Sequence, residues 1–316
     1  MNKHIICSIV ILLTITFVSC NPTPEIEDSM LDSGKISFAL PDSLNRNLVS
    51  RYIANPTNVQ KETPVIIAAH GYTATTFEWE ELRAYADSAK TFYVSQVLLG
   101  GHGRSYEAFK AASWQDWQSS IIEEYIKLSD LGFKKIYLAG SSTGAPLILQ
   151  MLKSELFSKH TNPKGFFLVD PIVVSSNKTL TLVGLLGPVL GYTTVELDNG
   201  EVGKWYVYRP QETLKELMKL IDLTRRDLEN GITVSGNFYM KVYKSSIDET
   251  ADPVSAVMIY KGIKYEPSLN KNIDIEMVDS KIHVFTRLKG RPQISNKDKA
   301  LQHKAFAEME AKMKQL

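Results

Sequence analysis

The stretch that decides the fold runs from residue 134 to residue 144 and reads Lys-Lys-Ile-Tyr-Leu-Ala-Gly-Ser-Ser-Thr-Gly. Its first part is typical of a short buried strand, and this strand runs directly into Gly-x-Ser-x-Gly with a helical sequence behind it. Gly140 and Gly144, on either side of Ser142, remove the Cβ atoms that would clash in a tight turn. Pro146 suits the first turn of a helix. The pattern predicts a strand, turn and helix that present a nucleophilic serine at the edge of a sheet.

Strand-like and helical segments alternate on both sides of this stretch. Several strand-like segments, such as residues 65–69, are continuously apolar, as expected for strands that are covered on both faces. The expected strands are Ile36–Leu40, Leu48–Ala54, Pro64–His70, Phe92–Leu99, Lys135–Ala139, Gly165–Asp170, Phe238–Lys244 and Ile273–Val278. The alternation predicts an α/β fold with a mostly parallel central sheet and helices on both faces.

The segment from Pro171 to Asn237 breaks this alternation because it is too long for a single crossover between strands. It contains an apolar, glycine-spaced stretch at Leu180–Gly191 and a helix expected over Pro210–Asn230. Open α/β sheets bind ligands at the carboxyl ends of their strands. We therefore expect a cap over this edge at about residues 171–237, with a second small domain or an extra core layer as the alternative.

The composition is that of an ordinary globular protein. The 316 residues include 36 Lys+Arg and 35 Asp+Glu, and the hydrophobic fraction is 44%. This length is enough for one large domain with a sizeable core. A formal net charge of +1 gives no reason to expect a nucleic-acid partner. Two cysteines cannot form a disulfide framework or a thiolate zinc site.

The first residues of the chain form a separate segment. Lys3 precedes an apolar run, Ile5–Val18, which is shorter than the roughly 20 residues that a membrane-spanning helix needs. This pattern predicts a secretory signal peptide over residues 1–19. Ser19 directly before Cys20 resembles the processing site of a bacterial lipoprotein, so we expect Cys20 to be the lipidated first residue of the mature chain. A plain signal peptide with a chance cysteine is the alternative.

Residues 20–35 are polar and acidic and contain two prolines, which predicts a flexible tether ahead of a domain over residues 36–316. The acyl chains of a lipoprotein cysteine are enough for stable attachment to a membrane. The sequence therefore predicts a protein of the bacterial cell envelope that is anchored by lipid, with the outer membrane as one candidate location.

Four landmarks, in order along the chain, resemble the α/β-hydrolase superfamily, and in particular its serine carboxylesterases and monoacylglycerol lipases. The tripeptide His-Gly-Tyr at 70–72 resembles the family's oxyanion turn, and Gly-His-Gly-Arg-Ser at 101–105 resembles the loop after its next strand. The Gly-x-Ser-x-Gly around Ser142 and a late pair of an acid and a histidine follow. The resemblance covers most of the chain from Pro64 towards the C-terminus.

The resemblance implies hydrolysis of carboxylic esters, of acyl or lipid type, through an acyl-serine intermediate and without a metal or organic cofactor. It makes Ser142 the nucleophile and the backbone N–H groups of Tyr72 and Thr143 the donors of the oxyanion hole. A small-molecule ester is the expected substrate. A peptidase or amidase of the same fold, or a non-catalytic ligand-binding lipoprotein, is the alternative, because fold alone does not determine function.

Histidine is the expected base, and position separates the candidates. His283 follows the last expected strand and lies in a loop, where the family carries its base. His303 lies within a helix expected over Lys297–Leu316, where a solvated side chain is the simpler interpretation. His70 and His102 are expected to brace loops. We therefore expect His283 to deprotonate the nucleophile.

Three aspartates are candidates for the acid that orients the base. Asp248 matches the family's acid by its distance from the penultimate strand. Asp252 is followed by a proline and suits the N-terminus of a helix. Asp170 ends the sixth expected strand, where some lipases carry their acid. We expect Asp248 to be the acid, with Asp252 and then Asp170 as its rivals.

Overall fold

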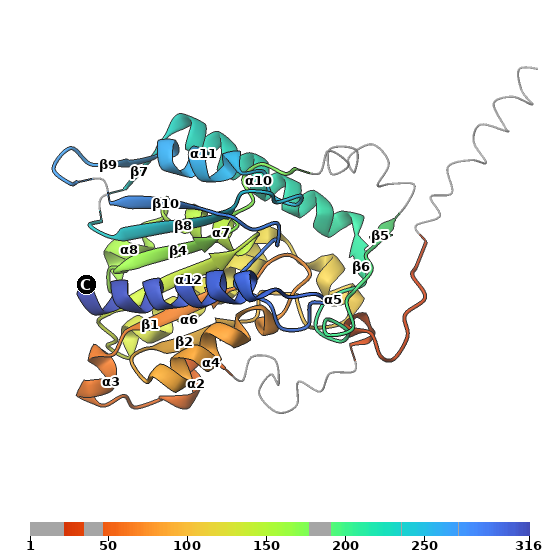
Figure 1. Ribbon diagram of the computed structural model, residues 1–316, viewed down its shortest axis with the longest axis horizontal. Coiled ribbons are helices and arrows are strands. Elements are labelled where there is room, and N and C mark those ends of the chain that lie inside the picture. Colours follow the sequence, from red (N-terminus) through yellow and green to blue (C-terminus); the bar gives the residue numbers. More distant parts are fainter. Residues whose placement is uncertain (1–21, 35–46, 177–190, 235, 271) are drawn as a thin grey trace, which may run out of the picture.

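The computed structural model describes residues 22–34, 47–176, 191–234, 236–270 and 272–316 (Figure 1). Among the helices of these residues, none combines the length and the apolar character that crossing a membrane requires. The expected signal peptide, Cys20 and the first expected strand, Ile36–Leu40, lie outside the described residues.

A six-stranded parallel sheet forms the centre of the fold, in the order β10-β8-β4-β3-β1-β2. Its strands are β1 (Val65–Ala69), β2 (Tyr93–Val97), β3 (Ile136–Ser141), β4 (Gly165–Val169), β8 (Tyr239–Ser245) and β10 (Ile273–Val278). Every residue of β1 and β3 is buried, which explains the continuous apolar runs in these segments. The fold class expected from the sequence is confirmed, and six expected strands coincide with these six.

Helices cover both faces of the sheet, and alternate residues of each strand point into two separate core layers. Ile67 packs in the larger layer and Ile66 in the smaller one. In Figure 1, α12 lies across the front of the sheet, while α10 and α11 lie together beyond the β10 edge. The larger layer is bounded by α6 (Trp114–Asp130), α7 (Gly144–Met151), α10 (Gln211–Asn230) and α11 (Val254–Gly262), and the smaller by α4 (Glu80–Ala89) and α12 (Asn296–Gln315).

Shorter elements connect and flank these layers. They are η1 (Leu31–Ser33), α2 (Val49–Tyr52), α3 (Asn58–Glu62), η2 (Thr76–Trp79), α5 (Tyr106–Ala111), α8 (Leu156–Lys159), β5 (Tyr192–Thr194), β6 (Tyr208–Pro210), β7 (Ile232–Val234) and β9 (Ile263–Tyr265). β5 and β6 pair antiparallel, and β7 and β9 pair parallel outside the central sheet.

The strand expected at Leu48–Ala54 is wrong, because this segment contains the helical turn α2. Side chains of the neighbouring elements bind its backbone in place of a sheet partner. The Val49 N–H donates to Ser95 Oγ at 3.1 Å, and the Ser50 N–H donates to Glu124 Oε1 at 3.3 Å. A short apolar run does not distinguish a strand from a helical turn by periodicity, so only these long-range contacts decide.

The end of the expected tether packs against the folded domain. Leu31 of η1 is buried in the larger core layer. Asp32 is buried too, and its carboxylate accepts the backbone N–H groups of Val207 and Tyr208 at 2.9 and 3.1 Å. The folded domain thus includes residues ahead of position 36, where the sequence analysis placed its start.

The described part of the expected cap belongs to the core and to the site together. Leu220 and Leu228 of α10 pack in the larger core layer, whereas Leu214 near the start of this helix lines the cavity over Ser142. Of the apolar stretch Leu180–Gly191, only its last residue lies within the described chain.

Candidate active site

Ser142 lies on the sharp turn between β3 and α7, as the sequence predicts. Its φ of 47° is in the left-handed region, which residues with a side chain rarely adopt. The neighbouring glycines make this turn sterically accessible. A Cβ on Gly140 would lie 2.6 Å from the carbonyl carbon of Gly144, and one on Gly144 would lie 2.3 Å from the carbonyl oxygen of Ala69. Nothing larger than hydrogen fits at either position.

The structure joins Ser142, His283 and Asp248 in one line of hydrogen bonds. His283 Nε2 lies 2.9 Å from Ser142 Oγ, and His283 Nδ1 lies 2.8 Å from Asp248 Oδ2. The three residues come from the turns after β3, β10 and β8, all at the carboxyl edge of the sheet. This is the geometry of a nucleophile, a base and an acid that orients the base.

The environment of Asp248 keeps its carboxyl group ionised. Burial by itself would raise the pKa of Asp248, but hydrogen bonds and positive charge from His283 and Lys244 outweigh it and hold the pKa well below its usual range. The backbone N–H groups of Thr250 and Ala251 also donate to Oδ1, at 2.8 and 3.1 Å. A carboxylate that stays charged can orient an imidazole and stabilise its protonated form.

The two rival aspartates make other contacts. Asp252 Oδ1 accepts the backbone N–H of Val254 at 2.8 Å, in the first turn of α11, which is the capping role considered in the sequence analysis. Asp170 is fully buried, and its carboxylate accepts the backbone N–H groups of Ser245 at 2.6 Å and Val284 at 2.8 Å. Asp170 thereby connects the two loops that carry the acid and the histidine.

Lys244 is a buried residue of the site that the sequence analysis missed. Its Nζ lies 2.5 Å from Asp248 Oδ2 and 3.2 Å from Asp170 Oδ1, and all three side chains are fully buried. Two buried carboxylates repel each other, so the ammonium group between them stabilises both. Asp170, Asp248 and His283 are close enough to hold a metal ion, but the ammonium group already supplies the positive charge there. The available signal was a lysine near the end of β8, four residues before Asp248.

The backbone N–H groups of Tyr72 and Thr143 lie at the same cavity as Ser142. Neither N–H donates a hydrogen bond to another residue within the described ranges. The N–H of Gly71, the residue before Tyr72, is different, because it donates to Glu78 Oε1 at 2.7 Å. Both residues thus line the cavity beside Ser142, where the sequence analysis expects the oxyanion hole.

Buried polar side chains support this turn from below. His70 Nε2 accepts the N–H of Leu99 at 3.1 Å, so the proton is on Nδ1, which donates to the Gly71 carbonyl oxygen at 2.8 Å. Burial lowers the pKa of His70 to about 4, which keeps its ring neutral. Glu78, which the sequence analysis also missed, accepts from both Gly71 N–H and the Ser141 hydroxyl. These contacts are structural, as expected for His70.

The site opens into a cavity of about 320 Å³, a size suited to a small organic ligand. Apolar side chains from α10 form part of its wall, in keeping with an expected acyl group. Charged side chains also line it, which the sequence analysis did not foresee. They are Glu78, Glu196, Glu201, Glu249, Arg209, Arg287 and Arg291.

Comparisons with known proteins agree with this architecture. No family model matches the sequence. A thermostable monoacylglycerol lipase from Bacillus sp. (strain H-257) is 25% identical over 212 residues, which cover 66% of this chain and 80% of that lipase.

Solved structures with the same fold include lipolytic enzymes. One, from work on the metagenome-derived enzymes LipS and LipT, superposes with a TM-score of 0.62 at 15% identity and covers 79% of this chain and 94% of its own. The monoglyceride lipase of Saccharomyces cerevisiae has a TM-score of 0.60 at 12% identity, with coverages of 83% and 88%. With its parallel sheet and the turn around Ser142, the chain has the α/β-hydrolase fold.

Proposed function

We propose that the protein is a serine hydrolase that cleaves carboxylic esters through an acyl-serine intermediate. The observation that carries this proposal is the hydrogen-bonded line from Ser142 Oγ through the His283 imidazole to Asp248. The similarity to a monoacylglycerol lipase supports an ester rather than an amide as the substrate.

Each group has a defined task in this mechanism. His283 Nε2 takes the proton of Ser142 as Oγ attacks the carbonyl carbon of the ester. The backbone N–H groups of Tyr72 and Thr143 donate to the oxygen that becomes negative. The imidazolium then gives its proton to the departing alcohol, and Asp248 stabilises its charge. Water, deprotonated by His283, attacks the acyl-serine; the bond to Ser142 Oγ then breaks, the imidazolium returns its proton to Oγ, and the carboxylic acid is released.

Labelling with a fluorophosphonate probe tests the proposal. We expect the folded wild-type chain to react at Ser142 and the Ser142→Ala variant not to react, because only an activated serine attacks such a probe at a useful rate. Ser175 lines the same cavity and provides a matched control, so Ser175→Ala should still be labelled. Folded wild-type protein that stays unlabelled would instead support the non-catalytic ligand-binding lipoprotein.

The pH profile gives a second prediction. His283 acts as a base only when its imidazole is neutral, whereas the lowered pKa of Asp248 keeps that carboxylate charged in mild acid. We therefore expect kcat/KM for ester hydrolysis to fall about tenfold per pH unit on the acid side, as for loss of a single base. Initial rates in a constant-ionic-strength buffer series measure this slope. A slope near two would show that a second group, such as Asp248, titrates in the same range.

We propose that Cys20 carries the lipid that anchors the protein to a membrane of the cell envelope. The support is the sequence alone: a short apolar run followed by Ser19 and Cys20. Cys20→Ser should move the protein from the membrane fraction to the soluble fraction, because it removes the acylated side chain. Cys7→Ser, within the apolar run, is the matched control and should leave the protein with the membranes. A Cys20→Ser variant that sediments like the parent would contradict lipidation at this residue.

A further inference from the structure

Arg209 lines the cavity over Ser142 and has no counter-ion in the described part of the chain. It lies in β6, opposite Thr193 of β5. Its Nε is buried without a hydrogen-bond partner, and the guanidinium forms no ion pair with a described residue. Burial lowers the pKa of Arg209, and the nearby Tyr72 hydroxyl opposes this shift. Arg209 is thus partly buried, and its guanidinium has no ion-pair partner among the described residues.

Arg287 Nε is also buried without a partner, but the other two arginines of the cavity differ from Arg209 because other donors of their guanidinium groups are paired. Arg287 forms an ion pair with Glu201 at 2.5 Å, and its guanidinium lies 4.6 Å from the centre of the Trp205 ring. Arg291 donates to the carbonyl oxygens of His283 at 2.6 Å and Arg287 at 2.9 Å. Both have structural partners, which leaves Arg209 available to a ligand.

The residues outside the described ranges offer almost no carboxylate that could neutralise Arg209. Residues 1–21 and 177–190 contain neither Asp nor Glu, and position 235 is a serine and position 271 a lysine. Asp42 is the one acidic residue among residues 35–46. Glutamates also line the cavity, but an unpaired guanidinium there can form a charge-assisted hydrogen bond with an anionic group of a ligand.

We propose that Arg209 binds an anionic group, a carboxylate or a phosphate, of the ester substrate. The guanidinium fork matches the oxygens of either group, and water exclusion strengthens such a charge-assisted pair. The cavity of about 320 Å³ has room for a small charged ester. This inference rests on the proposed ester hydrolysis and names the substrate class of the same site.

The test compares charged esters with neutral isosteres, using the full chain. On the acyl side the pair is 4-nitrophenyl glutarate and 4-nitrophenyl glutaramate; on the alcohol side it is 4-carboxyphenyl butyrate and 4-carbamoylphenyl butyrate. In one of these two pairs, depending on whether the anionic group belongs to the acyl or the alcohol side, wild type should prefer the charged ester by about tenfold or more in kcat/KM. A charge-assisted hydrogen bond is strong enough for this preference. Arg209→Met should abolish that preference, and Arg209→Lys should retain part of it. Arg226→Met, exposed on α10, is the matched control and should keep the preference.

Binding is measured separately, so that the two proposals fail in different ways. Glutarate and inorganic phosphate are titrated calorimetrically into Ser142→Ala protein with and without Arg209→Met, after circular dichroism shows that both are folded. Binding of either anion that depends on Arg209 supports the anion site. If this binding is found but no ester is hydrolysed, the proposed ester hydrolysis is overturned while the anion site stands. Ester hydrolysis with no charge preference and no Arg209-dependent anion binding overturns the inference alone.

Discussion

Replacing His283 with alanine should lower kcat for ester hydrolysis by about 10⁴-fold or more, because the members of a catalytic triad act as a unit. The variant loses the imidazole that lies 2.9 Å from Ser142 Oγ, and with it the acceptor of the serine proton. Half-burial of His283 at the edge of the cavity should let the variant fold. Initial rates with a short-chain acyl ester, on protein whose fold is checked by circular dichroism, measure the loss.

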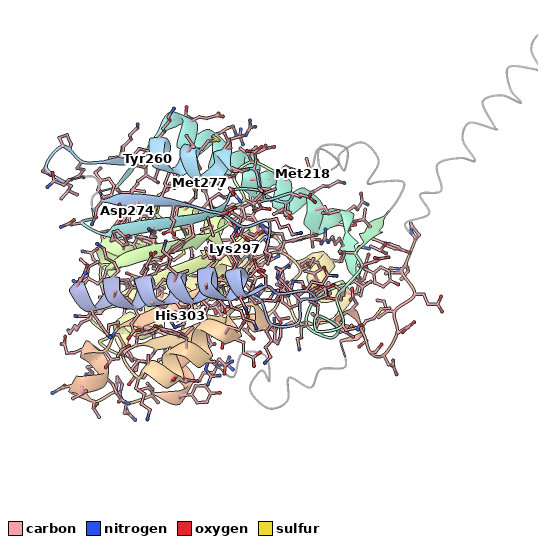
Figure 2. All side chains as sticks on the ribbon, viewed as in Figure 1. Met218, Tyr260, Asp274, Met277, Lys297 and His303 are labelled. Atoms are coloured by element: carbon pink, nitrogen blue, oxygen red, sulfur yellow. The ribbon has the colours of Figure 1, made fainter. Side chains whose placement is uncertain are left out.

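His303→Ala is the matched control. Its side chain is exposed on α12, the helix that lies across the outside of the sheet (Figure 2), and its ring lies 5.9 Å from that of Tyr85. Such exposed substitutions usually stay within about 0.5 kcal/mol in stability, and we expect turnover close to that of the parent. Near-parental turnover in His283→Ala would refute the assignment of the base. An inactive but folded His303→Ala would redirect it.

Lys244→Met should have the second largest effect, on stability as well as on activity. It removes the ammonium group that lies between Asp170 and Asp248 and leaves two desolvated carboxylates close together. Loss of one partner from a buried charge cluster costs about 3–5 kcal/mol, so the free energy of unfolding at neutral pH should fall by about this amount. Urea unfolding measures it.

The pH dependence of this loss distinguishes electrostatics from packing. Without Lys244, the pKa of Asp248 rises in the folded variant, because the hydrogen bond and positive charge that lower it are lost while its burial remains. The variant's deficit should be largest above the ordinary aspartate pKa and should shrink as the pH falls and the carboxylates take up protons. Lys241→Met, a partly exposed lysine of the same strand that pairs with Glu276 at 3.0 Å, should cost about 1 kcal/mol or less. A pH-independent loss in Lys244→Met would indicate packing instead.

Much of the sheet could be predicted from the sequence because its strands are buried on both faces. Segments such as 65–69 are apolar without interruption, and the glycine and proline positions around them mark their ends. The three-residue strands β5, β6, β7 and β9 were not foreseen. Such short pairs depend on their partner strand and carry no periodicity of their own, which is also why α2 was mistaken for a strand.

The turn around Ser142 was determined by the sequence alone, because every constraint on it is local. The strand, the positive φ and the two glycines lie within one short stretch, so their residue types are sufficient to predict the serine's position. Chain order and the last strand likewise placed His283 at the same edge of the sheet. Neither inference needed a distance between remote residues.

Only the tertiary structure decided which carboxylate contacts His283, and how it is held there. Asp248 and Asp252 are only four residues apart in the sequence, and the course of the loop brings only Asp248 to within 2.8 Å of the imidazole. Lys244 matters because the fold buries it between two carboxylates, one of them from a distant segment. Arg209 matters because the fold places no carboxylate of a described residue within ion-pair distance of it. The order of residues in the sequence does not show which charged groups become buried or which distant segments come into contact, and these two factors set the strength of the electrostatic interactions.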